Sequence, residues 1–314
     1  MKGVIQDRFG APDVLQVAEA PRPTRLFTEV LLKVHAASIN RVDLLVRSGV
    51  FPLLGKPPFI LGWDLSGVVE EVELGSTRFK VGDEVFGMPL FPRAANAYSE
   101  YTAAPSRQLW LKPASLTHVQ AAALPMAGLT ALQALDDIAK LQAGQRVLIL
   151  GAGGGVGHIA VQIAKALGAE VFATASAAKH DFVKSLGADH LIDYKTTDFA
   201  SVVSDADVVF DIVGGDNAQR SLQVLKPGGI VVTTEGLSTG NMPALAASVG
   251  RRFSSVAVEA DGAGLERLVG WVNSGQLNPH VSATFSLKDA ALAHALVAKG
   301  DTQGKVVLDL QGRA

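Results

Sequence analysis

The segment that decides the fold reads Arg146-Val-Leu-Ile-Leu-Gly-Ala-Gly-Gly-Gly-Val-Gly-His-Ile-Ala-Val-Gln-Ile-Ala-Lys-Ala-Leu-Gly168. Its first part, 147–150, is a run of four apolar residues, as in a strand that is buried on both faces. Five glycines follow between Gly151 and Gly157, and the apolar residues after them recur at helical spacing until Gly168, a suitable C-cap. The segment therefore predicts a strand, a tight glycine turn and a helix. This arrangement presents backbone N–H groups to a dinucleotide pyrophosphate.

The glycine turn matches the dinucleotide fingerprint with one substitution. Counted back from Gly157, it reads Ala152-x-Gly154-x-x-Gly157, so alanine replaces the first glycine of G-x-G-x-x-G. A turn that only lets the helix pack close to the strand is the alternative interpretation. The chain continues with a strand at 170–175, a helix at 181–186 and a strand at 190–193, which favours a βαβαβ succession and a dinucleotide. The predicted cofactor contacts in the loop are Ala152, Gly154, Gly155, Val156 and Gly157.

Length and composition exclude several classes of protein. With 314 residues, of which 48% are hydrophobic, the chain is long enough for two domains with sizeable cores. Lys+Arg 28 against Asp+Glu 30 leaves no basic excess for nucleic acid or an anionic membrane. The absence of cysteine excludes disulfides, thiolate catalysis and cysteine-ligated metals. No apolar run has membrane-spanning length and the N-terminus does not resemble a signal peptide, so we expect a cytoplasmic protein with a small-molecule substrate.

The region up to about residue 120 shows a period of two in short runs separated by Gly and Pro. Segments 30–35, 66–72 and 83–87 read as strands, which predicts a β-rich domain of short antiparallel strands. One helix, at 42–47, interrupts them, and Asn40 is placed to cap it. A helix cap and an active-site role are both open for Asn40 at this point.

Four motifs of this region together resemble one family. They are Ala36-Ala-Ser-Ile-Asn-Arg-Val-Asp43, Leu61-Gly-Trp-Asp-Leu-Ser-Gly-Val-Val69, Phe79-Lys-Val-Gly-Asp-Glu-Val-Phe86 and Tyr98-Ser-Glu-Tyr101. Their order is similar to that in the medium-chain dehydrogenase/reductase superfamily, and most closely to its zinc-less quinone oxidoreductase branch, the relatives of zeta-crystallin. The resemblance covers nearly the whole chain. It implies an α/β fold in which a GroES-like, β-rich catalytic domain (1–122, completed by 261–314) joins a Rossmann domain with a doubly wound parallel sheet (123–260).

The departures from zinc-dependent members of this superfamily bear on the chemistry. Asn40 and Arg41 stand where those enzymes have a Cys-His pair, and Trp63 stands in place of a ligand histidine. Met126 stands in place of a third ligand, a cysteine, and the four-cysteine structural lobe is absent. We therefore expect no metal. Without a Lewis acid, the chemistry that remains is hydride transfer to an acceptor that is already electrophilic.

The resemblance also implies the residues of the acceptor site. Asn40, Asp43 and Tyr98 are the candidate catalytic residues, with Asn40 and Tyr98 as hydrogen-bond donors. A structural role for Asp43, orienting neighbouring backbone or Arg47, is the alternative. Trp63 and Phe51 are candidate walls of the pocket, and Phe51 stands where many relatives have a tyrosine.

The end of the second strand indicates which cofactor binds. NAD sites place a carboxylate there for the ribose 2′-hydroxyl, whereas this chain has Ala173-Thr-Ala-Ser176 followed by Lys179, so NADPH is favoured. A solvated lysine is the alternative for Lys179. The resemblance adds Tyr194 at the adenosine phosphate and Thr130 near the nicotinamide, although the Thr130 hydroxyl could instead bond to its own helix.

The second half of the Rossmann pattern completes the predicted cofactor site. A buried strand at 207–214 precedes a helix at 217–225, and a strand follows at 226–234. The remaining predicted cofactor contacts are Ser176, Val213, Gly214, Gly236 and Lys305. Segment 253–258 reads as an edge strand, and by analogy with the relatives we expect it to pair across a two-fold axis in a homodimer.

Together these patterns predict an NADPH-dependent, zinc-independent oxidoreductase that transfers hydride to a quinone or an α,β-unsaturated carbonyl. Two alternatives are open from the sequence. One is a 2-enoyl-thioester reductase, which uses the same hydride chemistry on a larger substrate. The other is a non-enzymatic NADPH-binding sensor or structural protein.

Overall fold

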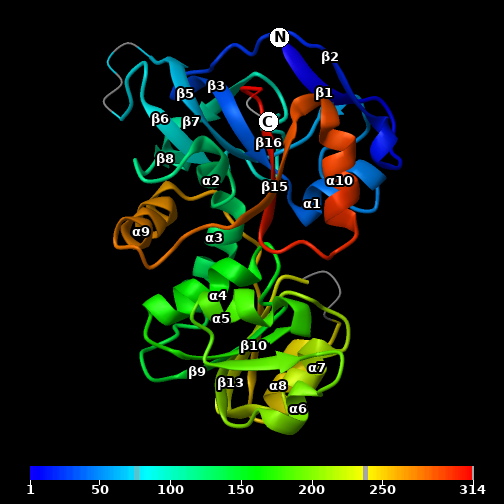
Figure 1. Ribbon diagram of the computed structural model, residues 1–314, viewed down its shortest axis with the longest axis vertical. Helices are drawn as coiled ribbons and strands as arrows, with labels where there is room; N and C mark the ends of the chain where they lie inside the picture. Colours follow the sequence, from blue (N-terminus) through cyan, green and yellow to red (C-terminus); the bar gives the residue numbers. More distant parts are fainter. Residues whose placement is uncertain (74, 76–77, 236–239, 313–314) are drawn as a thin grey trace. The chain divides into compact units, whose positions relative to one another are not determined.

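The chain forms two compact units, and the named strands of each unit pair within that unit (Figure 1). The computed structural model describes residues 1–73, 75, 78–235 and 240–312. The first unit comprises Met1–Leu129, Glu259–Asn273 and Pro279–Ala314, and the second comprises Thr130–Val258 and Ser274–Asn278. The segment 274–278, expected in the first unit, belongs to the second. The reason is a reciprocal pair of hydrogen bonds, from Asn278 N–H to Gln162 Oε1 (2.9 Å) and from Gln162 Nε2 to the Asn278 carbonyl (3.2 Å).

The first unit is built mainly of antiparallel strands, as the period of two predicts. One sheet has the order β2-β1-β4, and a seven-stranded sheet has the order β15-β16-β3-β5-β6-β8, with β7 paired to β3. The C-terminal strand β16 lies between β15 and β3, so the end of the chain completes this sheet. The strands are β1 Lys2–Gln6, β2 Leu15–Glu19, β3 Glu29–Ser38, β4 Phe59–Ile60, β5 Asp64–Glu71, β6 Glu84–Gly87, β7 Tyr101–Pro105, β8 Leu109–Leu111, β15 Val281–Ser286 and β16 Lys305–Asp309.

Short helices border this sheet. α1 Arg41–Ser48 begins directly after Asn40, and α2 His118–Ala122 begins with reciprocal hydrogen bonds between Thr117 and Gln120. The small side chains of α2 let it pack directly against β3 and β16, in a cluster of Ala36, Ala122, Ala123 and Val307. α3 Pro125–Leu132 crosses the boundary between the units, and α9 Gly262–Asn273 and α10 Ala290–Ala298 come from the C-terminal part. Among the described residues, no helix is long and apolar enough to cross a bilayer.

The second unit contains a six-stranded parallel sheet in the order β11-β10-β9-β12-β13-β14. Numbered along the chain, this is the order 3-2-1-4-5-6 of a doubly wound Rossmann sheet, which confirms the predicted fold class. The strands are β9 Arg146–Leu150, β10 Glu170–Ala175, β11 His190–Asp193, β12 Ala206–Asp211, β13 Leu225–Thr233 and β14 Arg252–Ser255. The helices are the π-helix η3 Gln133–Ile138, α4 Gly157–Ala166, the 3-10 turn η4 Ala177–Lys179, α5 His180–Ser185, α6 Phe199–Val202, α7 Asn217–Ser221 and α8 Met242–Ser248.

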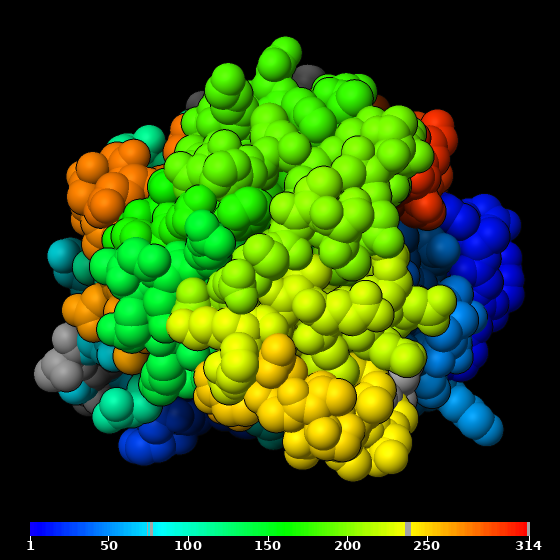
Figure 2. All heavy atoms as spheres, turned by 90° about the horizontal axis from the view of Figure 1, so that it is seen from below, coloured from blue at the N-terminus to red at the C-terminus, as the bar shows by residue number. Residues whose placement is uncertain are grey.

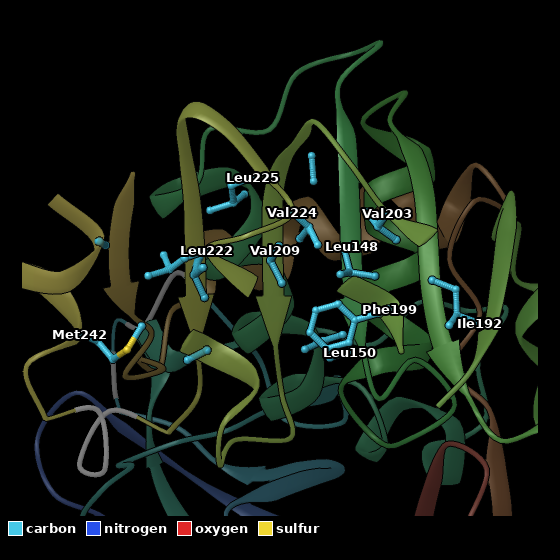
Figure 3. Close-up of a cluster of buried hydrophobic side chains, with 14 residues drawn as sticks. Leu148, Leu150, Ile192, Phe199, Val203, Val209, Leu222, Val224, Leu225 and Met242 are labelled. Carbon is cyan, nitrogen blue, oxygen red and sulfur yellow. The ribbon is translucent and has the colours of Figure 1, made fainter. Parts of the chain in front are cut away.

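Apolar side chains from strands and helices meet on one face of this parallel sheet. Leu148 and Val209 come from the central strands, and Phe199 comes from a covering helix (Figure 3). The order of strands reverses between β9 and β12, so their carboxyl ends border the crevice in which such sheets bind ligands. The glycine loop follows β9 and therefore lies at this crevice.

Two predicted elements end elsewhere than the sequence suggests. The helix predicted at 217–225 ends at Ser221, because Leu225 already pairs with Ala206 as the first residue of β13. The edge strand predicted at 253–258 is β14, four residues long. Strands β1 and β2 were not expected, because neither alternates between buried and exposed residues: β1 is mostly buried and β2 is mostly exposed.

Gly67 marks a close approach of two strands in the first unit. A Cβ atom at Gly67 would lie 2.2 Å from the carbonyl oxygen of Lys33 on β3, which is backbone and cannot move away. We expect Gly67→Ala to lower the free energy of unfolding by about 1–3 kcal/mol, measured by urea denaturation. Gly270→Ala is the matched control, because Gly270 is an exposed residue of α9 with no atom within 4 Å of its would-be Cβ. That control should gain about 0.5–1 kcal/mol, and equal stability of the two variants would contradict the prediction.

Candidate active site and cofactor site

The glycine loop of the second unit has the packing that a dinucleotide site requires. A Cβ at Gly157 would lie 2.2 Å from the carbonyl oxygen of Gly151, so only glycine lets α4 begin this close to the loop. At Gly154, by contrast, the nearest atom would be 3.4 Å away, which leaves space in front of the loop. The geometry of a helix start leaves the N–H groups of Gly155, Val156 and Gly157 without partners inside α4. The loop therefore fits a phosphate group.

A buried threonine, which the sequence did not single out, holds this loop in place. Thr174 on β10 accepts the N–H of Gly151 through its hydroxyl (3.0 Å), and its carbonyl accepts the N–H of Ala152 (2.9 Å). The side chain of Ala152 is wholly buried. Alanine therefore replaces the first fingerprint glycine at a position where the loop packs against the sheet.

The residues predicted at the adenosine phosphate gather at one edge of the parallel sheet. β10 and β11 pair in parallel with Ala175 opposite Asp193, so Ser176 and Tyr194 follow the two strands side by side. Lys179 approaches from η4, since a Cβ at Gly153 would lie 2.8 Å from its Cδ. A hydroxyl and an exposed phenol therefore follow neighbouring strands, and a cation lies beside Gly153 of the loop.

The turn after β12 lies on the other side of the glycine loop. Asp211 accepts the N–H groups of Val213 and Gly214 through one carboxylate oxygen (3.0 Å each), which fixes the turn at the carboxyl end of the strand. The side chain of Val213 lies beside the loop, 3.0 Å from a would-be Cβ at Gly151. A cavity of about 190 Å³ lies between this turn and the end of β13, and its lining includes Asp211, Gly214 and Thr233. Gly236, also predicted as a cofactor contact, lies outside the described residues.

In the first unit, the side chain of Asn40 contacts two side chains that are far from it in the sequence, those of Asp64 and Lys305. The Nδ2 of Asn40 donates to Asp64 Oδ2 (2.9 Å), and its Oδ1 accepts from the ammonium group of Lys305 (2.5 Å). Lys305 also donates to the carbonyl of Ile39 (3.0 Å), and its Nζ lies 3.6 Å from Asp64 Oδ2. Asp64 and Lys305 are almost completely buried, and Asn40 is 8% exposed. Asn40 thus precedes α1 as the sequence predicts, but its side chain is held by β5 and β16.

This arrangement bears on the predicted role of Lys305. Its ammonium group has three protons and three oxygen atoms of the first unit near it, two at hydrogen-bond distance. Its pKa is lowered by burial, and the carboxylates of Asp64 and Asp43 oppose that shift. A direct contact of Lys305 with the cofactor stays a prediction, whereas its contact with Asn40 is part of the structure.

Asp43 lies in the first turn of α1 and is also completely buried. Its Oδ2 accepts the backbone N–H of Asn40 (2.7 Å), so the expectation that it orients neighbouring backbone agrees with the structure. Arg47, the other expected partner, instead donates to the carbonyl of Gly10 (3.2 Å) and contacts His294. Burial raises the pKa of Asp43 to about 7, with the nearby carboxylate of Asp64 adding to the shift and the Asn40 N–H and Lys305 opposing it.

The other predicted acceptor-site residues differ in how far their side chains are buried. The Tyr98 hydroxyl is buried and lies 3.2 Å from His294 Nε2, so it can act on an acceptor only through a neighbour such as Asp43. Trp63 is also buried and donates to the carbonyl of Arg93 (2.7 Å). Phe51 is half-buried just after α1, and Thr130 is buried in α3. Their contacts with a substrate or cofactor stay predictions.

Sequence reasoning missed Asp64 and His294 as parts of this cluster. Asp64 lies in one of the four family motifs, where nothing marks it as a partner of Asn40, and His294 lies in an alanine-rich helix without a local signal. A charged residue inside an otherwise apolar strand, as in 64–69 or 305–310, was the available sign of a buried partner.

Comparisons with known proteins agree with this geometry. Residues 27–114 match the family model "Alcohol dehydrogenase GroES-like domain", and residues 186–308 match "Zinc-binding dehydrogenase". The 2-methylene-furan-3-one reductase of Solanum lycopersicum is 34% identical over 98% of this chain and 79% of its own length.

Two solved structures have the same fold over the whole chain. The quinone oxidoreductase from Coxiella burnetii has a TM-score of 0.92 and 37% identity, and the match covers 99% of each chain. The Escherichia coli quinone oxidoreductase, complexed with NADPH, has a TM-score of 0.88 and 28% identity over 98% of this chain and 100% of that one. The chain belongs to the medium-chain dehydrogenase/reductase superfamily, in its quinone oxidoreductase branch.

Proposed function

We propose that this protein is an NADPH-dependent, zinc-independent reductase that transfers hydride to a quinone or an α,β-unsaturated carbonyl. The observation that carries the proposal is the buried amide of Asn40. Its oxygen accepts from Lys305 and one of its two N–H groups donates to Asp64, which leaves the second N–H for the oxygen of an acceptor. The names of its relatives, a furanone reductase and quinone oxidoreductases, are consistent with such an acceptor.

The residues at the zinc-ligand positions of the superfamily do not fit zinc. Asn40, Arg41, Trp63 and Met126 stand at those positions, and none of them has a side chain that zinc commonly binds. The neighbouring Asp64 is a carboxylate, but it is taken by Asn40, by the N–H of Met126 (2.8 Å) and by Lys305. A positive ammonium group 3.6 Å from the carboxylate would repel a divalent cation. Among the described residues, no group of three or more His, Asp or Glu side chains could hold a metal. We therefore derive no step through zinc.

The Asn40 N–H would supply the stabilisation that the reaction needs. NADPH, when bound, supplies the hydride, and negative charge then develops on the acceptor oxygen. A preorganised donor stabilises this charge more than the neutral ground state, because it does not have to reorient during the reaction. Lys305 and Asp64 fix the amide from both sides and so preorganise it.

The proposed preference for NADPH over NADH rests on Ser176, Lys179 and Tyr194, which follow the carboxyl ends of β10 and β11. No carboxylate lies at 176–180, directly after β10, where NAD sites have the acidic residue that binds the ribose 2′-hydroxyl. Lys179 and the Ser176 hydroxyl can bind a phosphate, and the exposed ring of Tyr194 can cover the adenosine. A cytoplasmic location also belongs to this proposal, and the absence of cysteine is compatible with it.

A homodimer through β14 is the last part of the proposal. β14 lies at one edge of the parallel sheet, and this part of the chain (yellow) reaches the surface in Figure 2. Val256 N–H donates to Thr233 of β13, so alternate N–H groups, those of Phe253 and Ser255, point away from β13. These outward groups could pair with a second copy of the same strand.

Cofactor preference can be tested at Lys179. We expect Lys179→Ala to weaken NADPH binding roughly 10-fold or more, because a charged hydrogen bond to the 2′-phosphate is lost, while NADH binding stays nearly unchanged. Fluorescence titration of both cofactors measures this. Lys184→Ala, an exposed lysine on α5, is the matched control. Equal losses for NADPH and NADH in Lys179→Ala would show that Lys179 does not read the phosphate.

Acceptor reduction can be tested by following NADPH consumption with quinones, enones, enals and enoyl thioesters. We expect turnover with one of the first three classes, and Asn40→Ala should lower kcat by roughly 10²–10³-fold, the usual effect of one lost oxyanion donor. Asn273→Ala, at the exposed end of α9, should have no effect. Turnover of enoyl thioesters alone would favour the thioester reductase, and turnover of none would favour the non-enzymatic alternative.

The dimer can be tested with two neighbouring proline substitutions in β14. Ser255→Pro removes an outward N–H and should give a monomer of unchanged stability, measured by solution scattering at micromolar concentration. Ser254→Pro removes an N–H that faces β13 and should lower the melting temperature instead. A wild-type protein with the mass of one chain would rule the dimer out.

A further inference from the structure

Two charged or polar side chains near the candidate site, those of Arg47 and His294, have no part in the proposed reaction. Arg47, on α1, lies 3.3 Å through its Nη1 from His294 Nδ1 on α10. The other ring nitrogen of His294 lies 3.2 Å from the hydroxyl of Tyr98, and the two rings meet edge to face. All three side chains are buried, with Arg47 7% exposed and the others 0%. The three residues form a chain of hydrogen bonds inside the first unit.

The chemistry of arginine fixes the direction of this chain. A guanidinium group can only donate, so Nδ1 of His294 must be the bare, accepting nitrogen. Burial and the charge of Arg47 lower the pKa of His294 to about 3, so the ring is neutral and its one proton is on Nε2. Nε2–H therefore donates to the oxygen of Tyr98. The Tyr98 hydroxyl proton cannot point back to His294 and must go elsewhere.

The hydroxyl of Tyr98 and the carboxyl group of Asp43 interact: Tyr98 lowers the pKa of Asp43, and Asp43 raises the pKa of Tyr98. Oδ2 of Asp43 is bound to the Asn40 N–H, but Oδ1 is buried and has no hydrogen-bond partner at bonding distance among the described residues. The charged groups around this carboxyl are Asp64 from β5 and Lys305 from β16. Asp13, just before β2, raises the pKa of Arg47, which lies at the other end of the chain of hydrogen bonds. The proton of Tyr98 and the open oxygen of Asp43 therefore complement each other.

We propose that His294 is a positioning residue, which directs the hydroxyl proton of Tyr98 onto Asp43 and so stabilises the carboxylate that holds the backbone of Asn40. The role of this carboxylate in turnover rests on the proposed function, because Asn40 is the donor in that reaction. The charge of Asp43 itself does not depend on any substrate. Because each group in this chain of hydrogen bonds donates to the next, the Tyr98 hydroxyl donates to the carboxylate of Asp43. This donation lowers the pKa of Asp43, whereas burial raises it.

The titration of Asp43 tests this inference directly. Infrared spectra recorded as a function of pH show the carbonyl band of a protonated carboxyl, and the band that Asp43→Asn removes belongs to Asp43. Wild-type Asp43 should ionise with a midpoint near 7. In Tyr98→Phe the anion loses its donor, so the midpoint should rise by about one pH unit. Tyr101→Phe, in the neighbouring strand β7, is the matched control and should leave the midpoint unchanged.

Variants of His294 distinguish two roles of its ring: orienting the hydroxyl proton of Tyr98, or only filling space in the core. His294→Leu frees the hydroxyl proton and should raise the midpoint as well. His294→Gln can accept from Arg47 through its oxygen and donate to Tyr98 through its nitrogen, so it should restore the wild-type midpoint. An unchanged midpoint in Tyr98→Phe, or a glutamine variant that behaves like the leucine variant, would overturn the proposal. If His294→Leu does not fold, Tyr98→Phe, which keeps the ring, still decides the matter.

Kinetics on the same variants distinguish this inference from the proposed function. If some acceptor is reduced, the fall of kcat/KM toward acid should move to higher pH in Tyr98→Phe, together with the infrared midpoint. A protein that reduces none of the acceptors contradicts the proposed function, while the infrared midpoints still decide the role of His294. Turnover with an unshifted midpoint supports the function and contradicts the inference.

Discussion

The ammonium group of Lys305 holds three parts of the first unit together. It lies inside the protein on β16, and it binds the carbonyl of Ile39 and the side chain of Asn40 beside Asp64 at the start of β5. Taking an ammonium and a carboxylate out of water costs several kcal/mol each, and only good hydrogen-bond geometry offsets this cost. Removing one partner would leave the other as an uncompensated buried charge. The C-terminal strand is therefore part of the site as well as part of the sheet.

The same contacts decide which way the amide of Asn40 faces. If its oxygen and nitrogen were exchanged, the oxygen would face the carboxylate of Asp64 and the NH₂ group would face the ammonium of Lys305. Both contacts would then be repulsive. The opposite charges on the two sides thus fix the amide in one orientation, and an exposed asparagine has no such constraint. This fixed orientation suits Asn40 to be the donor in the proposed reaction, beyond its place as the last residue before a helix.

The sequence was sufficient for the fold and for the glycine loop because their signals are local. The apolar run at 147–150, the glycines after it and the helical spacing beyond Gly157 lie within one short segment, and the structure confirms the parallel sheet they predict. The cluster at Asn40 has no local signal, since Asp64 and Lys305 are 24 and 265 residues away from it. The contact of Lys305 with Asn40 could not be predicted, because a sequence does not show which residue a buried lysine meets. The burial of Tyr98 was hidden for the same reason, because His294 comes from a helix near the end of the chain.

The balance of charge in this cluster fits acceptors that need little activation. Asp64 and Lys305 neutralise one another, so Asp43 is the excess charge, and burial together with the nearby Asp64 raises its pKa to about 7. The cluster therefore carries no net positive charge at neutral pH, in contrast to a site built around a divalent cation. Without positive charge, it cannot lower the pKa of an alcohol as a Lewis acid does. A single oriented amide N–H is enough for an oxygen that becomes negative only as hydride arrives, and quinones and conjugated carbonyls have such an oxygen.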